Sequence, residues 1–391
     1  MAFDLKELQN KLAENKVYDA WQYVQSLMET LTYMNASYAL LEKVYDHRKK
    51  VLKATSQELL DAAHKHKGEP VAVSADYLAR THLNIVGLEI DDSLYLRKTA
   101  LEFFHYARLS VDVLSQIINA ALFGDDSYPV KEMNLPQKVS GKLRQTASFN
   151  TIQILLASGI ANGEIKYLYA FDNYIKHVKT ILITVKNSFI IGTNNEFQIA
   201  NFIYRGTPYQ SVDAMSKITI VKSEVNKLIE DVLTELVCQV SNCVNNNSRY
   251  QSIRFKQILQ ETDKGSILKY MAYFIEVEND LSELPTQIKV MPLIIKPNDK
   301  IYSFVLNIDN IFITLKGKGE EGIIGVATIQ CDTDSNEMYK TYSISACTMS
   351  TYYEYLINFE KNHQYITFNY EAMEGEVIIL NEDKDSGGEA E

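Results

Sequence analysis

The sequence predicts an α+β protein in which a bundle of long helices is followed by an antiparallel β-sandwich or small barrel. In the first half of the 391 residues, apolar side chains recur at alternating spacings of three and four, which is the pattern of helices with one buried face. Beyond Asn247 the apolar period shortens to two, and turn residues separate short alternating segments, as in a sheet. We therefore expect a helical domain over residues 1–247 and a β-rich domain over residues 248–380.

The first long helix is expected to reach about residue 66, because Gly68 and Pro70 follow and stop a helix. Its apolar seam extends over about four heptads, so the helix should bury this seam against neighbours in an elongated bundle or a long coiled pair. The seam consists of Val17, Ala20, Val24, Leu27, Leu31, Met34, Tyr38, Leu41 and Tyr45.

Three further long helices and one insertion are expected. The second helix should start at the N-cap sequence Asp91-Asp92-Ser93 and end near Leu122, just before a glycine. A third covers about residues 162–189 and a fourth about residues 211–245. Between them, two alternating apolar segments separated by turn residues predict a β-hairpin insertion over about residues 188–205.

Charge is unevenly distributed along the chain, whose net charge is −11. Residues 1–190 hold 22 basic against 21 acidic residues, a balance of +1, and the remainder holds 17 against 29, a balance of −12. An acidic second half argues against broad binding to a nucleic-acid duplex, which needs a basic surface. Any nucleic-acid contact should therefore be local and lie in the helical half. Residues 381–391 are expected to form a disordered acidic tail.

The four cysteines, Cys238, Cys243, Cys331 and Cys347, are expected to be reduced structural thiols. Cys238 and Cys243 are too far apart for the usual zinc pair, and no histidine follows nearby, so we expect no metal site and no cofactor. No apolar run approaches the roughly 18 residues that cross a bilayer, and the N-terminus lacks a secretory apolar segment. A cytoplasmic protein without membrane contact is predicted.

The second helix carries a polar face opposite its apolar seam, formed by His105, Arg108, Asp112, Ser115 and Asn119. If this face meets a neighbouring helix, His105 and Asp112 would form an oriented general base and Arg108 would hold an anion. A solvated surface is the alternative interpretation. The third helix also carries a polar face opposite its apolar seam. The polar faces of the two helices are therefore expected to meet each other or the same face of a partner copy.

On the third helix, the segment Phe-Asp-Asn-Tyr-Ile-Lys-His over residues 171–177 is the most informative stretch of the chain. Asn173 and His177 are four residues apart and so share one helical face, together with Thr180 and Thr184. The neighbouring Lys176 supplies positive charge. Histidine is suited to proton transfer because its pKa lies near neutrality.

This segment resembles the signature of the HEPN superfamily, helical bundles in which an Arg-polar-x-x-x-His motif forms a metal-independent RNA-cleaving site. The resemblance covers about residues 90–245. His177 matches the family's histidine and Asn173 the polar residue, which implies catalytic roles for both, whereas Asp172 stands in place of the arginine. The phosphate-binding charge would then have to come from other residues, namely Lys176, Lys179 or Arg108, with His105 and Asp112 as further candidates for binding substrate.

The resemblance implies a protein that binds RNA or nucleotides or cleaves RNA, of the kind found in bacterial toxin and defence systems. A second class stays open: a non-enzymatic assembly protein whose helical bundle self-associates and whose β domain binds a protein partner. In either class we expect a homodimer through the helices at residues 93–122 and 162–189. A basic groove around His177 would favour RNA binding, and an acidic or apolar surface there would favour assembly.

Overall fold

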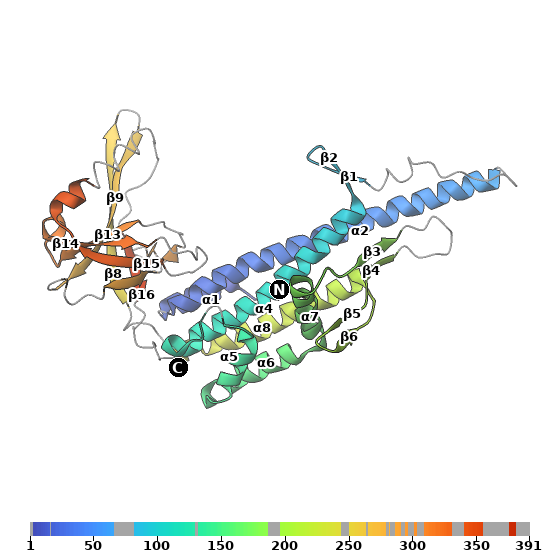
Figure 1. Cartoon of the computed structure of the whole chain (residues 1–391), viewed down its shortest axis with the longest axis horizontal. Coiled ribbons are helices and arrows are strands. Elements are labelled where there is room, and N and C mark those ends of the chain that lie inside the picture. The colour runs from blue at the N-terminus through green and yellow to red at the C-terminus, as the bar shows by residue number, and fades with distance from the viewer. Residues whose placement is uncertain are drawn as a thin grey trace. The chain divides into compact units, whose positions relative to one another are not determined.

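The computed structural model describes residues 3–15, 17–65, 82–129, 132–186, 196–243, 250–262, 265–278, 281, 286–290, 294–295, 301–302, 309–330, 340–354 and 375–380. The chain forms two compact units. One consists of Met1–Leu12 and Asp19–Val244, and the other of Ala13–Tyr18 and Asn245–Glu391. The first is built from long helices and the second from strands, so the predicted α+β class, a helical bundle followed by strands, is confirmed (Figure 1).

The long helices of the first unit lie side by side, as hydrogen bonds between them show (Figure 1). Ser110 donates to Thr30 at 3.1 Å, and Tyr38 lies 3.4 Å from Thr219. The first long helix ends at Lys65, close to the expected residue 66, and a short helix that was not predicted precedes it. The helices are α1 (Leu5–Glu14), α2 (Tyr18–Lys65), α4 (Asp92–Phe123), α5 (Leu135–Leu143), α6 (Asn150–Ala161), α7 (Gly163–His177) and α8 (Ala214–Cys238).

Helix α4 is the central helix of this unit, because apolar side chains on most of its circumference are buried. It begins as predicted: the Asp91 carboxylate accepts hydrogen bonds from the backbone N–H groups of Ser93 and Leu94 at 2.7 and 3.0 Å. It ends at Phe123, directly before Gly124, whose φ of 50° lies in the left-handed region that favours glycine. Its buried apolar side chains include Leu96, Phe103, Phe104, Ala107, Val111, Leu114, Ile117 and Ile118.

The third long helix is shorter than predicted. Helix α7 ends at His177, and strand β3 (Ile183–Lys186) begins where the helix was expected to continue to residue 189. Residues 178–185 contain six β-branched side chains, which lower helix propensity and favour strands. Burial there has the period of a strand, since Ile181 and Ile183 are buried and Leu182 is exposed. Thr180 and Thr184 therefore do not share a helical face with His177.

Small strands connect α7 to α8 and precede α4. The predicted hairpin at residues 188–205 starts earlier in the structure, because β3 pairs with β4 (Glu196–Ile199); residues 187–195 lie outside the described residues. A second hairpin, which was not predicted, joins β5 (Phe202–Tyr204) to β6 (Thr207–Tyr209). The remaining strands of this unit are β1 (His82–Ile85), β2 (Leu88–Asp91) and β7 (Val212–Asp213).

The second unit is built around one nine-stranded sheet of order β10-β15-β14-β13-β9-β8-β16-β11-β12. Its pairs are antiparallel except for β13 and β9, which run parallel. A small core of Phe274, Phe312, Ile323 and Tyr352 lies against this sheet. The strands are β8 (Tyr250–Thr262), β9 (Gly265–Val277), β10 (Gln287–Val290), β11 (Ile294–Ile295), β12 (Ile301–Tyr302), β13 (Asn310–Leu315), β14 (Ile323–Ile329), β15 (Lys340–Ala346) and β16 (Gly375–Leu380). The predicted tail at residues 381–391 lies outside the described residues.

Candidate functional site

The predicted site residues lie on two helices that pack against each other within the chain. Phe104 of α4 and Phe171 of α7 form the apolar centre of this contact, with ring centroids 4.2 Å apart. The helices run antiparallel, since His105 faces Asp172 and Asp112 faces Tyr169. Polar side chains of the two helices therefore meet each other. We refer to these residues as the α4–α7 cluster: His105, Arg108, Asp112, Tyr169, Asp172 and Lys176.

Asp172 is the buried carboxylate of this cluster, with a side chain only 1% exposed. Its Oδ2 lies 2.7 Å from Lys176 Nζ, one turn further along α7, and its Oδ1 lies 3.6 Å from His105 Nδ1. The 3.6 Å separation exceeds hydrogen-bond range, so the His105 contact becomes an ion pair when the imidazole is protonated. A buried carboxylate requires such partners, because an uncompensated charge inside a protein is costly. Asp172 is thus paired internally with Lys176.

Arg108 and Asp112 form the second ion pair of the cluster, one turn apart on α4. The guanidinium of Arg108 stacks over the Tyr169 ring, 3.4 Å from its centroid. Tyr169 Oη donates a 3.4 Å hydrogen bond to Asp112 Oδ1. Burial raises the pKa of Asp112, although Arg108 acts to lower it. Because its guanidinium is held by a carboxylate and a ring, Arg108 is committed to contacts within the chain.

These contacts correct two sequence interpretations of α4. The expected base of His105 and Asp112 is not formed, because His105 lies against Asp172 and Asp112 pairs with Arg108. The expected polar stripe also ends earlier, since Ser115 is buried and donates to the carbonyl of Val111. Asn119, also buried, bonds both the N–H and the carbonyl of Tyr128, so it holds the loop that follows α4.

The two residues expected to be catalytic lie at the end of α7. Asn173 is half-buried, whereas His177 is exposed as the last helical residue. Lys179 follows two residues later and is also exposed. Within the described part of the chain, neither the imidazole of His177 nor the ammonium group of Lys179 has a hydrogen bond or ion pair; the backbone N–H of Lys179 donates to the Tyr174 carbonyl at 3.2 Å. The end of α7 thus presents an imidazole and two ammonium groups, those of Lys176 and Lys179, to solvent.

Two features of the site were not predicted from the sequence. The role of Asp172 as a buried partner had a local signal, because Asp172 and Lys176 are four residues apart on one helix, the spacing of a favourable ion pair. Tyr169 had no such signal, since its partner Asp112 lies 57 residues away in the chain.

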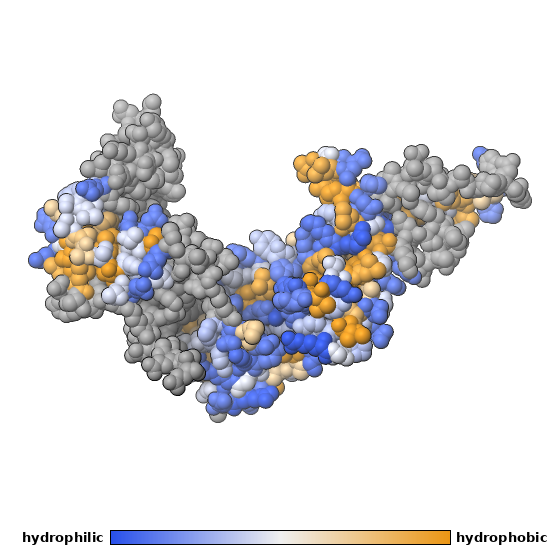
Figure 2. Space-filling view, in the orientation of Figure 1, coloured by the Kyte–Doolittle hydropathy of each residue, from blue (hydrophilic) through white to orange (hydrophobic). Residues whose placement is uncertain are grey.

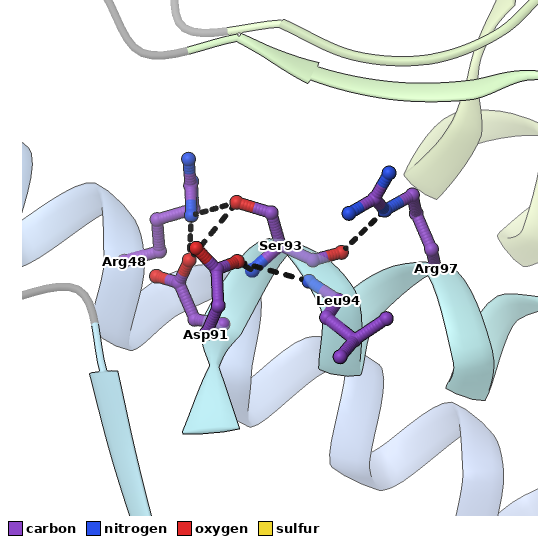
Figure 3. Close-up of polar contacts among 6 residues, drawn as sticks. Arg48, Asp91, Ser93, Leu94 and Arg97 are labelled. Atoms are coloured by element: carbon purple, nitrogen blue, oxygen red, sulfur yellow. Dashed lines mark hydrogen bonds and ion pairs between the residues drawn. The ribbon is translucent and has the colours of Figure 1, made fainter. Parts of the chain in front are cut away.

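A second polar cluster lies at the start of α4, where Arg48 of α2 forms an ion pair with Asp92 and donates to Ser93 Oγ at 3.2 Å (Figure 3). Both side chains of the pair are buried. Arg97 lies one turn along α4 and donates from Nε to the Ser93 carbonyl at 3.1 Å. Asp91, Ser93 and Arg97 line a pocket of about 310 Å³ together with residues 182–185.

Comparison with protein-family models, curated proteins and solved structures finds no significant match. Over the described residues, no group of three or more histidine, cysteine, aspartate or glutamate side chains is arranged to hold a metal ion. The same residues contain no helix that is both long enough and apolar enough to cross a membrane.

Proposed function

We propose that the helical unit binds single-stranded RNA at the end of α7, as an HEPN-like protein of a toxin or defence system. The observation that supports this best is the exposure of Lys176, His177 and Lys179 within four residues, beside the partly exposed ring of His105. Phosphate groups are attracted to such a local cationic surface. Of the two lysines, Lys179 supplies the uncompensated charge, because the ammonium group of Lys176 already pairs with the Asp172 carboxylate at 2.7 Å.

Proton transfer at a ribose 2′-hydroxyl would fall to His105 or His177. The buried Asp172 lies beside Nδ1 of His105, which leaves Nε2 of that ring for a ligand. Cleavage as in HEPN nucleases also needs an arginine on the phosphate, because a lysine lacks the bidentate guanidinium, and Arg108 is held by Asp112 and Tyr169. We therefore expect RNA binding with little or no cleavage in EDTA, and any residual cleavage to be abolished by His177→Ala or His105→Ala.

Fluorescence anisotropy with a labelled single-stranded RNA tests the binding surface. Lys179→Gln should weaken binding and reduce the slope of log Kd against log salt concentration by about 0.7, the value for one phosphate contact on a single strand. Lys166→Gln is the matched control, because Lys166 is also exposed on α7 but lies ten residues, or roughly 15 Å, before Lys176. Equal weakening by both variants, or by neither, would refute the proposed surface.

The assembly function is favoured by a separate observation at the hairpin of β1 and β2. Val86 and Leu88 are 98 and 66% exposed, and Figure 2 shows hydrophobic colour over this hairpin. Leu94, in the first turn of α4 that follows β2, is 55% exposed. Exposed aliphatic side chains that lie together mark protein-binding surfaces.

If the chain is a homodimer, light scattering at tens of micromolar, about the range in which weak dimers form, should give twice the monomer mass. Leu88→Ser with Leu94→Ser would restore the monomer if this surface forms the interface, and would leave the mass unchanged if α4 and α7 form it.

A further inference from the structure

The pocket at the start of α4 lies a short way along the chain from the proposed RNA-binding surface. Residues 182–185 contribute one part of its lining, and Asp91, Ser93 and Arg97 contribute the other. Residue 182 is only three residues beyond Lys179, so their Cα atoms are at most about 11 Å apart. A strand of RNA that binds at the end of α7 can therefore extend to this pocket.

The chain between the two places exposes apolar side chains among its lysines. Val178 and Leu182 are 59 and 61% exposed, whereas Ile181 between them is buried. Leu182 also lines the pocket, whose volume of about 310 Å³ is at the lower end of the range of small-molecule sites. Apolar side chains pack against the faces of unstacked nucleobases. The pocket is thus large enough for one base and has an apolar side chain for it to pack on.

Arg97 supplies a positive charge at the far side of this path. Its Nε donates to the Ser93 carbonyl at 3.1 Å, and its terminal nitrogens have no partner among the described residues, so they can bind a phosphate. The carboxylate of Asp91 also lines the pocket and disfavours a phosphate inside it. Figure 3 shows Asp91 and the Arg97 guanidinium on opposite sides of Ser93. The charges therefore favour an uncharged base in the pocket and a phosphate on Arg97.

We propose that a single strand of RNA bound at the end of α7 continues past Val178 and Leu182, places one base in the pocket and sets a following phosphate on Arg97. This inference rests on the proposed RNA binding and adds a path and a minimum length to it. A strand that contacts both Lys179 and Arg97 needs about four nucleotides, the lower end of single-strand site sizes. Charge and apolar packing act on every base alike, so the path carries no base preference.

Fluorescence anisotropy of the full chain with a labelled RNA octanucleotide tests the path. Arg97→Gln should weaken binding about tenfold at low salt and reduce the slope of log Kd against log salt concentration by about 0.7. The double variant with Lys179→Gln should reduce the slope by about 1.4, because two phosphate contacts are lost. Lys98→Gln is the matched control and should change neither quantity, since Lys98 is an exposed neighbour that pairs with Glu102 and does not line the pocket.

The failure of the path and the failure of RNA binding give different results. If the wild type does not bind the octanucleotide, both the RNA-binding function and the path are overturned. If Lys179→Gln weakens binding while Arg97→Gln behaves like Lys98→Gln, the RNA-binding function stands and the path alone is overturned.

A leucine variant tests the base contact. Leu182→Ala should weaken the octanucleotide about fivefold, the lower end of the effects for one base contact, and should leave the melting temperature near that of the wild type because the side chain is exposed. Leu40→Ala is the matched control, since Leu40 is a 43% exposed leucine that does not line the pocket. An abasic octanucleotide should respond to Arg97→Gln but not to Leu182→Ala. Equal weakening of both RNAs by Leu182→Ala, or an equal effect of Leu40→Ala, would refute the base contact.

Discussion

Two polar clusters on α4 differ in how completely they are buried, and this difference separates a structural role from a role in binding. At the start of the helix, Arg48 and Asp92 are 2% and 0% exposed, and both ends of the ion pair are inside the protein. In the α4–α7 cluster, Asp172 is just as buried, but its partner Lys176 is 44% exposed. The first pair can only connect α2 to α4. The second leaves an ammonium group at the surface, where a phosphate can reach it.

The largest effect is expected when the buried pair is broken. Arg48→Met should lower the free energy of unfolding by about 3–5 kcal/mol, because Asp92 is left buried without its cation. Urea denaturation measures this change. The double variant Arg48→Met with Asp92→Leu should recover most of the loss, since an apolar pair of similar volume replaces the ionic one. A single-variant loss below about 1 kcal/mol would show that the pair does not connect the two helices as described.

A smaller loss is expected at the cap of the same helix. Asp91→Ala should lower the free energy of unfolding by about 1 kcal/mol at pH 7. Burial acts to raise the pKa of Asp91, but the N–H groups of Leu94 and Ser93 and the charge of Arg48 outweigh it and lower this pKa. A lowered pKa stabilises the fold above the ordinary value near pH 4 and loses that stabilisation as the pH falls through the folded-state pKa. The difference between wild type and variant should therefore shrink below about pH 4; a constant difference down to pH 2 would contradict this.

The α4–α7 cluster should show the opposite pH dependence at Asp112. Burial raises the pKa of this carboxyl, so the folded state binds a proton more tightly than the unfolded state does. The carboxyl then contributes most stability below about pH 4 and less as the pH rises through the raised pKa. Asp112→Asn should change the free energy of unfolding by at most about 1 kcal/mol, with the variant gaining on the wild type between pH 4 and neutrality. Melting curves of the wild type and of Asp112→Asn over this pH range show whether the variant gains or loses stability relative to the wild type.

The smallest effect is expected at the exposed end of α7. His177→Ala should leave the melting temperature within about 1 °C of the wild-type value, because surface substitutions without partners change stability by less than about 0.5 kcal/mol. The same variant should alter RNA binding if His177 belongs to the proposed surface. A large loss of stability would instead show that the histidine has a structural partner.

Much of the helical unit was accessible from local sequence signals. The start of α4 at Asp91-Asp92-Ser93 and its end before Gly124 follow from cap chemistry that involves only neighbouring residues. The end of α7 was predicted wrongly, because Val178, Leu182 and Val185 continue the helical apolar spacing while residues 178–185 favour a strand. Two local rules conflicted there, and pairing of β3 with β4 decided between them.

The sequence by itself determined the fold class, the N-cap of α4 and the choice of α4 and α7 as the polar helices, because these depend on periodicity and on neighbours within a few residues. Only the tertiary structure decided which charges are partners. His105 meets Asp172, 67 positions further along the chain, and not Asp112 on its own helix. Side chains on one helix are arranged by the helical repeat, whereas contacts between helices depend on how the apolar faces of Phe104 and Phe171 pack. The pocket beside β3 has the same origin, since Arg97 and Ile183 come together only once the bundle has formed.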